Sequence, residues 1–166
     1  FVLLDYQKAR IVALFSPAAD PLGISYSTIQ SKITIGSGGL FGKGFGQGTQ
    51  AHLGFLPAAH TDFVFSTFAE EWGLLGVMLM LGAFAYLIYR VLILGMESGS
   101  NLAKFISLGT ALMLVIHLVI NLGSATGILP VIGVGLPLVS YGGSNLLTTT
   151  LMLGIIQAIA DKRARS

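Results

Sequence analysis

The stretch GFLPAAHTDFVFSTFAEEWGLLG, residues 54–76, decides how the fold is interpreted, because a polar region gives way there to a long apolar one. Three of the chain's 7 acidic residues, Asp62, Glu70 and Glu71, fall inside this stretch and within ten positions of one another. Acidic side chains are costly at the start of a membrane segment, and they are candidates for function when they occur there. We therefore take this junction as the centre of the candidate site.

The composition is that of a membrane protein. Hydrophobic residues make up 54% of the 166-residue chain and charged residues 10%, and the mean hydropathy is +0.83. A soluble domain carries roughly 25% charged residues. The net charge is only +2 and no basic run is interleaved with aromatic residues, which argues against a nucleic-acid surface. The chain has no cysteine, which excludes disulfides and thiolate metal sites.

The apolar segments predict an all-α polytopic membrane protein that forms one domain over residues 1–166. We expect three spans, at residues 62–94, 105–122 and 146–160. Residues 123–145 are apolar but interrupted by glycine and proline, so they predict a broken or re-entrant segment packed within protein. The other segments are the end of a span with an interfacial helix (1–15), an extracytoplasmic loop (16–61) and a charged tail (161–166).

The loop at 16–61 has two parts with different patterns. Residues 24–35 alternate apolar and polar side chains in a way that suits a short amphipathic helix or an extended segment. Residues 36–48 are so rich in glycine that they predict turns and close backbone approach rather than a regular element. The spacing around Lys43 does not match a Walker A motif, which argues against nucleotide binding.

The charges predict the orientation. Three spans place the 16–61 loop on the side of the membrane opposite the tail. Five basic residues lie around the short turn at 95–104 and in the tail: Arg90, Lys104, Lys162, Arg163 and Arg165. Four lie on the other side, Lys8, Arg10, Lys32 and Lys43, but long loops are largely exempt from the charge rule. Because short loops rich in lysine and arginine stay in the cytoplasm, the C-terminus is expected there, with the glycine-rich loop and Asp62 facing outward.

Asp62 has two interpretations on local sequence. Thr61 or Asp62 can cap the following helix, since a side-chain oxygen at that position accepts from free backbone N–H groups. Alternatively, an ionised carboxylate at the water interface and beside an apolar wall is suited to accept a proton from a sugar hydroxyl. Glu70 lies two turns further along the same face and is either a ligand for a cation or base or an interfacial acid that contacts water.

Lys43 and Lys32 are candidates to neutralise a diphosphate near the membrane surface, helped by backbone N–H groups of the glycine-rich loop. The alternative is that both are solvated lysines. His52 and His60 do not form a metal-ligand spacing with an acid. His117 is alone in a predicted span, where hydrogen bonding between helices is the more common role.

Four stretches together resemble one known family. They are QSKITIGSGGLFGKGFGQGTQ (30–50), FLPAAHTDFVF (55–65), EEWGLLG (70–76) and GILPVIGVGLPLVSYGGSN (127–145). In this order they resemble the shape, elongation, division and sporulation (SEDS) family, which includes RodA, FtsW and SpoVE, with a lean towards the RodA form. The resemblance implies a ten-span fold with a large extracytoplasmic loop, of which this chain would be a C-terminal fragment covering about spans seven to ten.

The resemblance also implies an activity. Family members are peptidoglycan glycosyltransferases that polymerise lipid II into glycan strands, with inversion, for cell elongation and rod shape. The implied location is the bacterial cytoplasmic membrane, and the implied partners are a class B penicillin-binding protein and other elongation-complex membrane proteins. Two alternatives stay open, a lipid II flippase and a scaffold without chemistry of its own. A flippase would need ionisable groups at mid-bilayer, whereas the acids here cluster at the edge of a span.

The resemblance carries over residues at the matching motif positions. The aspartate of the H-T-D-F motif falls on Asp62, which is the expected catalytic base. No metal-ligand set is assigned, and a divalent cation, Mg²⁺ or Mn²⁺, is the cofactor considered. The expected substrate-binding residues, partly from these motifs and partly from the charge arguments above, are Lys43, Lys32, His60, Glu70, Gln30, Ser140 and Tyr141.

Overall fold

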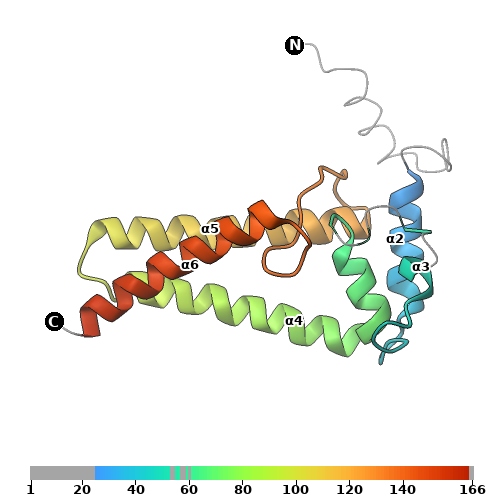
Figure 1. Ribbon diagram of the computed structural model, residues 1–166, viewed down its shortest axis with the longest axis horizontal. Helices are drawn as coiled ribbons and strands as arrows, with labels where there is room; N and C mark the ends of the chain where they lie inside the picture. Colours follow the sequence, from blue (N-terminus) through green and yellow to red (C-terminus); the bar gives the residue numbers. More distant parts are fainter. Residues whose placement is uncertain (1–24, 53–54, 57–58, 60, 165–166) are drawn as a thin grey trace, which may run out of the picture.

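A computed structural model describes residues 25–52, 55–56, 59 and 61–164 (Figure 1). The described part is helical and contains no strand, as predicted. The predicted interfacial helix at 1–15 lies outside the described residues. The helices are α2 (Tyr26–Ser37), α3 (Thr49–His52), α4 (Val64–Met96), α5 (Asn101–Thr126) and α6 (Gly143–Ala164).

Three helices in the described part are long and apolar enough to cross a membrane: Val64–Met96, Asn101–Thr126 and Gly143–Asp161. By length and composition these three helices agree with the three predicted spans. Figure 1 shows α4 and α5 running lengthwise with α6 between them and the C-terminus at one end. Towards that end the helices share a small core of Val91, Ala111 and Ile156. Helix α6 continues into the predicted charged tail as far as Ala164.

The prediction of one continuous helix over residues 62–94 is wrong, because α4 breaks at Gly73. This glycine has φ 66° and ψ −168°, a conformation that no helix contains. We call residues 64–72 the short arm of α4, and Figure 1 shows it turning sharply away from the rest of the helix to run beside α2. Sequence patterns missed the break because apolar residues continue on both sides of Gly73.

The glycine-rich segment forms turns after α2, as predicted, and it closes on the break in α4. We call residues 38–44 the clamp loop. Four backbone hydrogen bonds join it to α4: Leu74 N to Gly39 O (3.0 Å), Leu75 N to Leu40 O (3.1 Å), Lys43 N to Glu70 O (2.9 Å) and Gly44 N to Glu71 O (3.0 Å). The approach needs glycine on both sides, because a Cβ on Gly42 would collide with the Glu71 carbonyl and one on Gly73 with the Gly42 nitrogen.

An irregular segment, residues 127–142, connects α5 to α6 and confirms the predicted interruption in that region. Helix α5 ends at Gly127, whose left-handed φ of 70° reverses the chain. The segment is packed into the protein by Leu136 and Pro137, both of which are fully buried. It returns beside the start of the short arm, in a core cluster that includes Phe63, Ala125 and Leu136.

Candidate functional site

Asp62 lies in the turn immediately before the short arm, and its side chain is half-buried. The prediction that Thr61 or Asp62 caps this helix is wrong. The N-cap residue of α4 is Phe63, and no side chain donates or accepts a capping hydrogen bond there. Phe63 is only 2% exposed, so packing rather than capping fixes where the helix starts.

The Asp62 carboxylate has no partner among the residues that the structure describes. Within the described part of the chain, no side chain or backbone group forms a hydrogen bond or ion pair with it. Its Oδ2 faces Gly133 in the irregular segment, where an added Cβ would stand 3.7 Å away. The absence of a side chain at Gly133 therefore keeps space open beside the carboxylate.

Asn121 in α5 fixes the backbone at Asp62. Its Nδ2 donates to the carbonyl of Asp62 at 3.0 Å and to the carbonyl of Val134 at 2.9 Å. The side chain is fully buried, and its Oδ1 has no hydrogen-bond partner among the described residues. One buried amide thus joins the turn that carries Asp62 to the irregular segment opposite it. Asn121 falls inside the predicted span at 105–122, where a polar side chain is itself a signal of function that the motifs did not single out.

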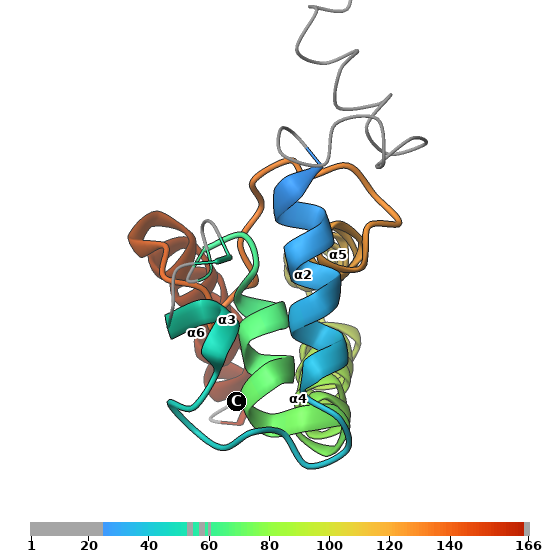
Figure 2. The same cartoon turned by 90° about the vertical axis from the view of Figure 1, so that its right-hand side faces the viewer.

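A second set of buried contacts joins α2 to the short arm and to the end of α5. Ser31 in α2 lies 2.6 Å from Ser66 of the short arm, oxygen to oxygen, and donates to the carbonyl of Ala125 at 2.6 Å. Both serines are fully buried. Figure 2 shows α2 lying against the short arm and the end of α5, which are the three elements that these bonds connect.

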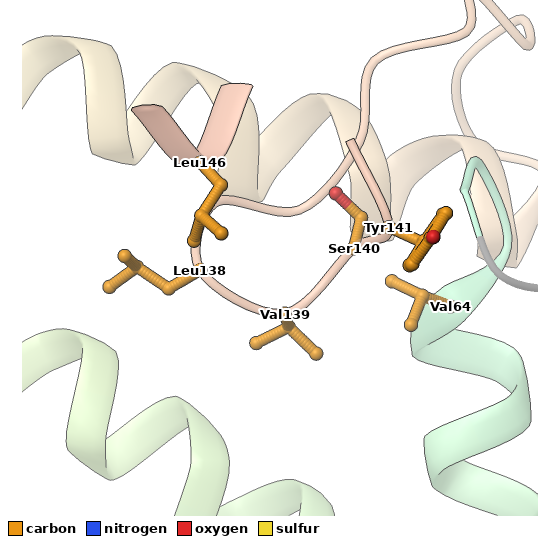
Figure 3. Close-up of a pocket in the computed structure, with 6 residues that line it drawn as sticks. All are labelled: Val64, Leu138, Val139, Ser140, Tyr141 and Leu146. Carbon is orange, nitrogen blue, oxygen red and sulfur yellow. The ribbon is translucent and has the colours of Figure 1, made fainter. Parts of the chain in front are cut away.

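A hollow of about 530 Å³ opens at the start of the short arm (Figure 3). It is lined by Val64, Leu138, Val139, Ser140, Tyr141 and Leu146. Val64 follows Asp62 by two positions, so this largely apolar hollow adjoins the candidate base. Tyr141 is 86% exposed there, and the Ser140 hydroxyl already donates to the carbonyl of Leu136 at 2.8 Å. Two of the predicted substrate residues therefore share this hollow.

Two other predicted substrate residues bind each other. Lys43 Nζ lies 2.6 Å from Glu70 Oε1, and the Glu70 side chain is fully buried. The same carboxylate also accepts hydrogen bonds from the Ser37 hydroxyl (3.3 Å), the Thr49 hydroxyl (3.1 Å) and the backbone N–H of Gln50 (3.3 Å). Glu70 lies eight residues after Asp62, roughly 12 Å along a helix axis, so the pair is at the opposite end of the short arm. Contact of Lys43 or Glu70 with substrate stays a prediction.

The remaining predicted residues have different surroundings. Lys32 is exposed on α2, and its Nζ stands 2.7 Å from where a Cβ on Gly127 would be. Gln30 is half-buried two residues earlier in the same helix. His60 lies outside the described residues. No group of three His, Cys, Asp or Glu side chains in the described part could hold a metal ion.

The family is decided by a match over nearly the whole chain. The model of the FtsW, RodA and SpoVE family, described as a cell cycle protein family, matches residues 1–165. The chain belongs to the FtsW, RodA and SpoVE family. Curated relatives carry names from both branches, so the match does not separate RodA from FtsW.

Similarity to individual family members is high. The chain is 46% identical to the peptidoglycan glycosyltransferase MrdB of Escherichia coli K12 over 163 residues, which are 98% of this chain and 44% of MrdB. It is 39% identical to the peptidoglycan glycosyltransferase RodA of Treponema pallidum, over 95% of this chain and 36% of that protein. The chain thus spans less than half the length of these family members.

Solved structures agree with the fold. One, described as showing structural coordination of polymerization and crosslinking by a peptidoglycan synthase complex, matches with a TM-score of 0.74 and 34% identity over 99% of this chain and 44% of that chain. The crystal structure of an aspartate-to-alanine mutant of Thermus thermophilus RodA matches with a TM-score of 0.60 and 28% identity over 98% of this chain and 59% of that chain. The three long helices and the segments between them are therefore a conformation that this family adopts.

Proposed function

We propose that this chain supplies the catalytic base of a peptidoglycan glycosyltransferase that polymerises lipid II, and that the base is Asp62. The observation that carries the proposal is a carboxylate without a partner in the described part, held in place through its own backbone by Asn121. General-base catalysis needs a carboxylate that is held in position and is not already occupied by a structural hydrogen bond or ion pair. The names of the family members cited above support the same activity.

The proposed reaction is one displacement with inversion. Asp62 accepts the proton of the acceptor's GlcNAc 4-hydroxyl as that oxygen attacks the anomeric carbon of the donor sugar. The bond between that carbon and the diphosphate oxygen breaks, and undecaprenyl diphosphate leaves with the electron pair. Asp62 ends protonated and returns its proton to water. The rate gain comes from holding the carboxylate within hydrogen-bond reach of the hydroxyl before the reaction begins.

Lys32 is the better placed of the two lysines to meet the leaving diphosphate, because it is exposed, whereas Lys43 is paired with a buried carboxylate. The hollow beside Val64 suits an apolar part of a lipid-linked substrate, with the exposed Tyr141 hydroxyl at its rim. The described residues provide no metal cluster, so no step is assigned to a protein-bound Mg²⁺ or Mn²⁺. A cation carried by the diphosphate itself is compatible with this arrangement.

The proposed setting follows from the three candidate spans and the basic residues of the short turn and tail. We place Asp62 and the 16–61 loop on the outer face of the bacterial cytoplasmic membrane, where the membrane-anchored lipid II would be met, and the C-terminus in the cytoplasm. A class B penicillin-binding protein, which crosslinks the new strands, is the proposed partner, together with other elongation-complex membrane proteins. One similar structure is described as a complex that coordinates polymerization and crosslinking, which supports this pairing.

The test is polymerisation of purified lipid II by the full-length protein in detergent or liposomes, with its synthase partner present. We expect glycan product from the wild type and a loss of at least about 100-fold in kcat for Asp62→Asn, the scale of a lost general base. Full activity in Asp62→Asn contradicts the proposal and favours the scaffold. Loss of lipid II transport across liposomes, with polymerisation intact, favours the flippase.

A further inference from the structure

We propose that Lys43 and Glu70 are positioning residues for Asp62. Their ion pair closes the clamp loop on the break in α4 and thereby sets the direction of the short arm that follows the catalytic base. The inference rests on the proposed function of Asp62 and adds to it a device, remote from the carboxylate, that fixes where the carboxylate stands.

The clamp loop replaces the two helical hydrogen bonds that the break opens. In an unbroken helix, Leu74 N–H would bond to the carbonyl of Glu70, and Leu75 N–H to that of Glu71. Here the two amides donate to Gly39 and Leu40, while the two carbonyls accept from Lys43 and Gly44. The loop is thus inserted between the two halves of α4. Because backbone groups at membrane depth must be satisfied within the protein, the break depends on the loop staying in place.

Lys43 fastens the loop twice. Its backbone N–H donates to the carbonyl of Glu70, and its side-chain Nζ pairs with the carboxylate of the same residue at 2.6 Å. That carboxylate is fully buried, and its other donors, from Ser37, Thr49 and Gln50, come from both flanks of the loop. Removing the cation from a buried ion pair strongly destabilises the folded protein, because it leaves the carboxylate charge buried and unpaired. Glu70 therefore requires the loop in its closed position.

The short arm transmits the state of the clamp to Asp62. It is a helical segment of nine residues, about 12 Å long, with the clamp at one end and Asp62 at the other. A tilt of roughly 5° at the clamp end moves the Asp62 end by about 1 Å. A displacement of that size is enough to cost on the order of 100-fold in rate. The contacts made by Asn121 and Ser66 restrain the arm nearer its Asp62 end, and together with the closed clamp they give it one defined direction.

The experiment compares Lys43→Met, Lys43→Arg and Glu70→Gln in the full-length protein with its synthase partner. Glu71→Gln is the matched control for the carboxylate, since Glu71 is adjacent to Glu70 and half-buried but makes no ion pair in the described part. Lys104→Met, an exposed lysine at the start of α5, is the control for the cation. The readouts are kcat and KM for lipid II and the hydrogen exchange of backbone amides.

In Lys43→Met and Glu70→Gln, kcat is expected to fall by about 10-fold to 100-fold while KM changes by less than about twofold, because the base is displaced but substrate contacts remain. Exchange of the amides at 38–44 and 74–75 is expected to become at least about tenfold faster, with α5 unchanged as a check that the protein is folded. Lys43→Arg, which keeps the charge, is expected to restore most of kcat. Both controls are expected to match the wild type.

Three results would overturn the inference. The first is unchanged kcat and exchange in Glu70→Gln. The second is a rise in KM alone for Lys43→Met, which would make Lys43 a substrate contact. The third is a loss of activity in Lys43→Met that Lys43→Arg does not restore. Polymerisation that does not depend on Asp62 overturns the proposed function, whereas polymerisation that depends on Asp62 but not on Lys43 and Glu70 overturns only the clamp.

Discussion

Replacing Asn121 with leucine tests whether the position of Asp62 is set through its backbone. Leucine has nearly the same shape as asparagine but cannot donate. The variant therefore removes the hydrogen bonds to the carbonyls of Asp62 and Val134, at 3.0 and 2.9 Å, without opening a large cavity. It leaves the Asp62 side chain and the hollow beside Val64 untouched. Any loss of activity then comes from a change in the position of the Asp62 carboxylate rather than from a change in its chemistry.

The expected effects on stability and on rate differ in size. Two hydrogen bonds contribute about 1 kcal/mol each to the free energy of unfolding, and their loss costs about 2 kcal/mol. Part of this is offset, because the variant also removes Asn121 Oδ1, a buried acceptor without a partner, whose burial costs roughly 1–2 kcal/mol. The net destabilisation is expected to be about 1 kcal/mol or less. By contrast, a shift of about 1 Å at Asp62 is expected to lower kcat by on the order of 100-fold.

The assay pairs lipid II polymerisation with thermal unfolding of the same full-length preparations. Asn145→Leu is the matched control, since Asn145 also binds a carbonyl of the irregular segment, Gly135 at 3.3 Å, but does not contact Asp62. We expect Asn121→Leu to lose most of kcat at nearly native melting temperature, and Asn145→Leu to keep most of both. Equal losses of activity in the two variants, or a loss that follows the folded fraction, would refute positioning through Asn121.

Three further changes test other parts of the site. Gly73→Ala forces a side chain onto a backbone with φ 66° and ψ −168°, so the free energy of unfolding, measured by thermal melts, should fall by about 1–3 kcal/mol. The control is Gly82→Ala, because a Cβ at Gly82 meets open space. Equal stability of the two variants would contradict the break in α4. Lys32→Met should raise KM for lipid II by about tenfold at similar kcat, the value of one charge-assisted contact, and an unchanged KM would remove Lys32 from the substrate. Gly133→Val should crowd Asp62 Oδ2 and lower kcat by at least about tenfold in the same assay, whereas full activity would place the reacting hydroxyl elsewhere.

Hydropathy alone predicts most of the fold. Long apolar runs with few charges predict the three spans, whose observed bounds differ from the predicted ones by up to four residues at each end. The same pattern predicts that residues 127–142 leave the helix, because glycine and proline interrupt an apolar stretch. The pattern for α2 was ambiguous between helix and extended segment. In the structure this segment is a helix. Its buried residues, Ser31 and Thr34, are three residues apart and therefore lie on one face of the helix.

The break in α4 could not be predicted from local sequence. A single glycine inside an apolar run is tolerated in a helix, so Gly73 carries no signal by itself. What breaks the helix there is a loop some thirty residues earlier, whose Gly42 fits against Gly73 with no room for a side chain. Such a fit depends on tertiary contact. The same distance in sequence explains why Lys43 and Glu70 were predicted as separate substrate contacts rather than as a pair.

The buried polar side chains suggest why the break lies where it does. Ser31, Ser66, Glu70 and Asn121 are all fully buried, and each one contacts the short arm, the turn before it or the loop that closes on it. Burying polar groups in a membrane protein is expensive unless they are satisfied and serve a purpose. A straight helix would need none of these contacts and would carry the chain away from the irregular segment. The break brings the turn with Asp62 back against Gly133, so that the proposed base lies beside an open space.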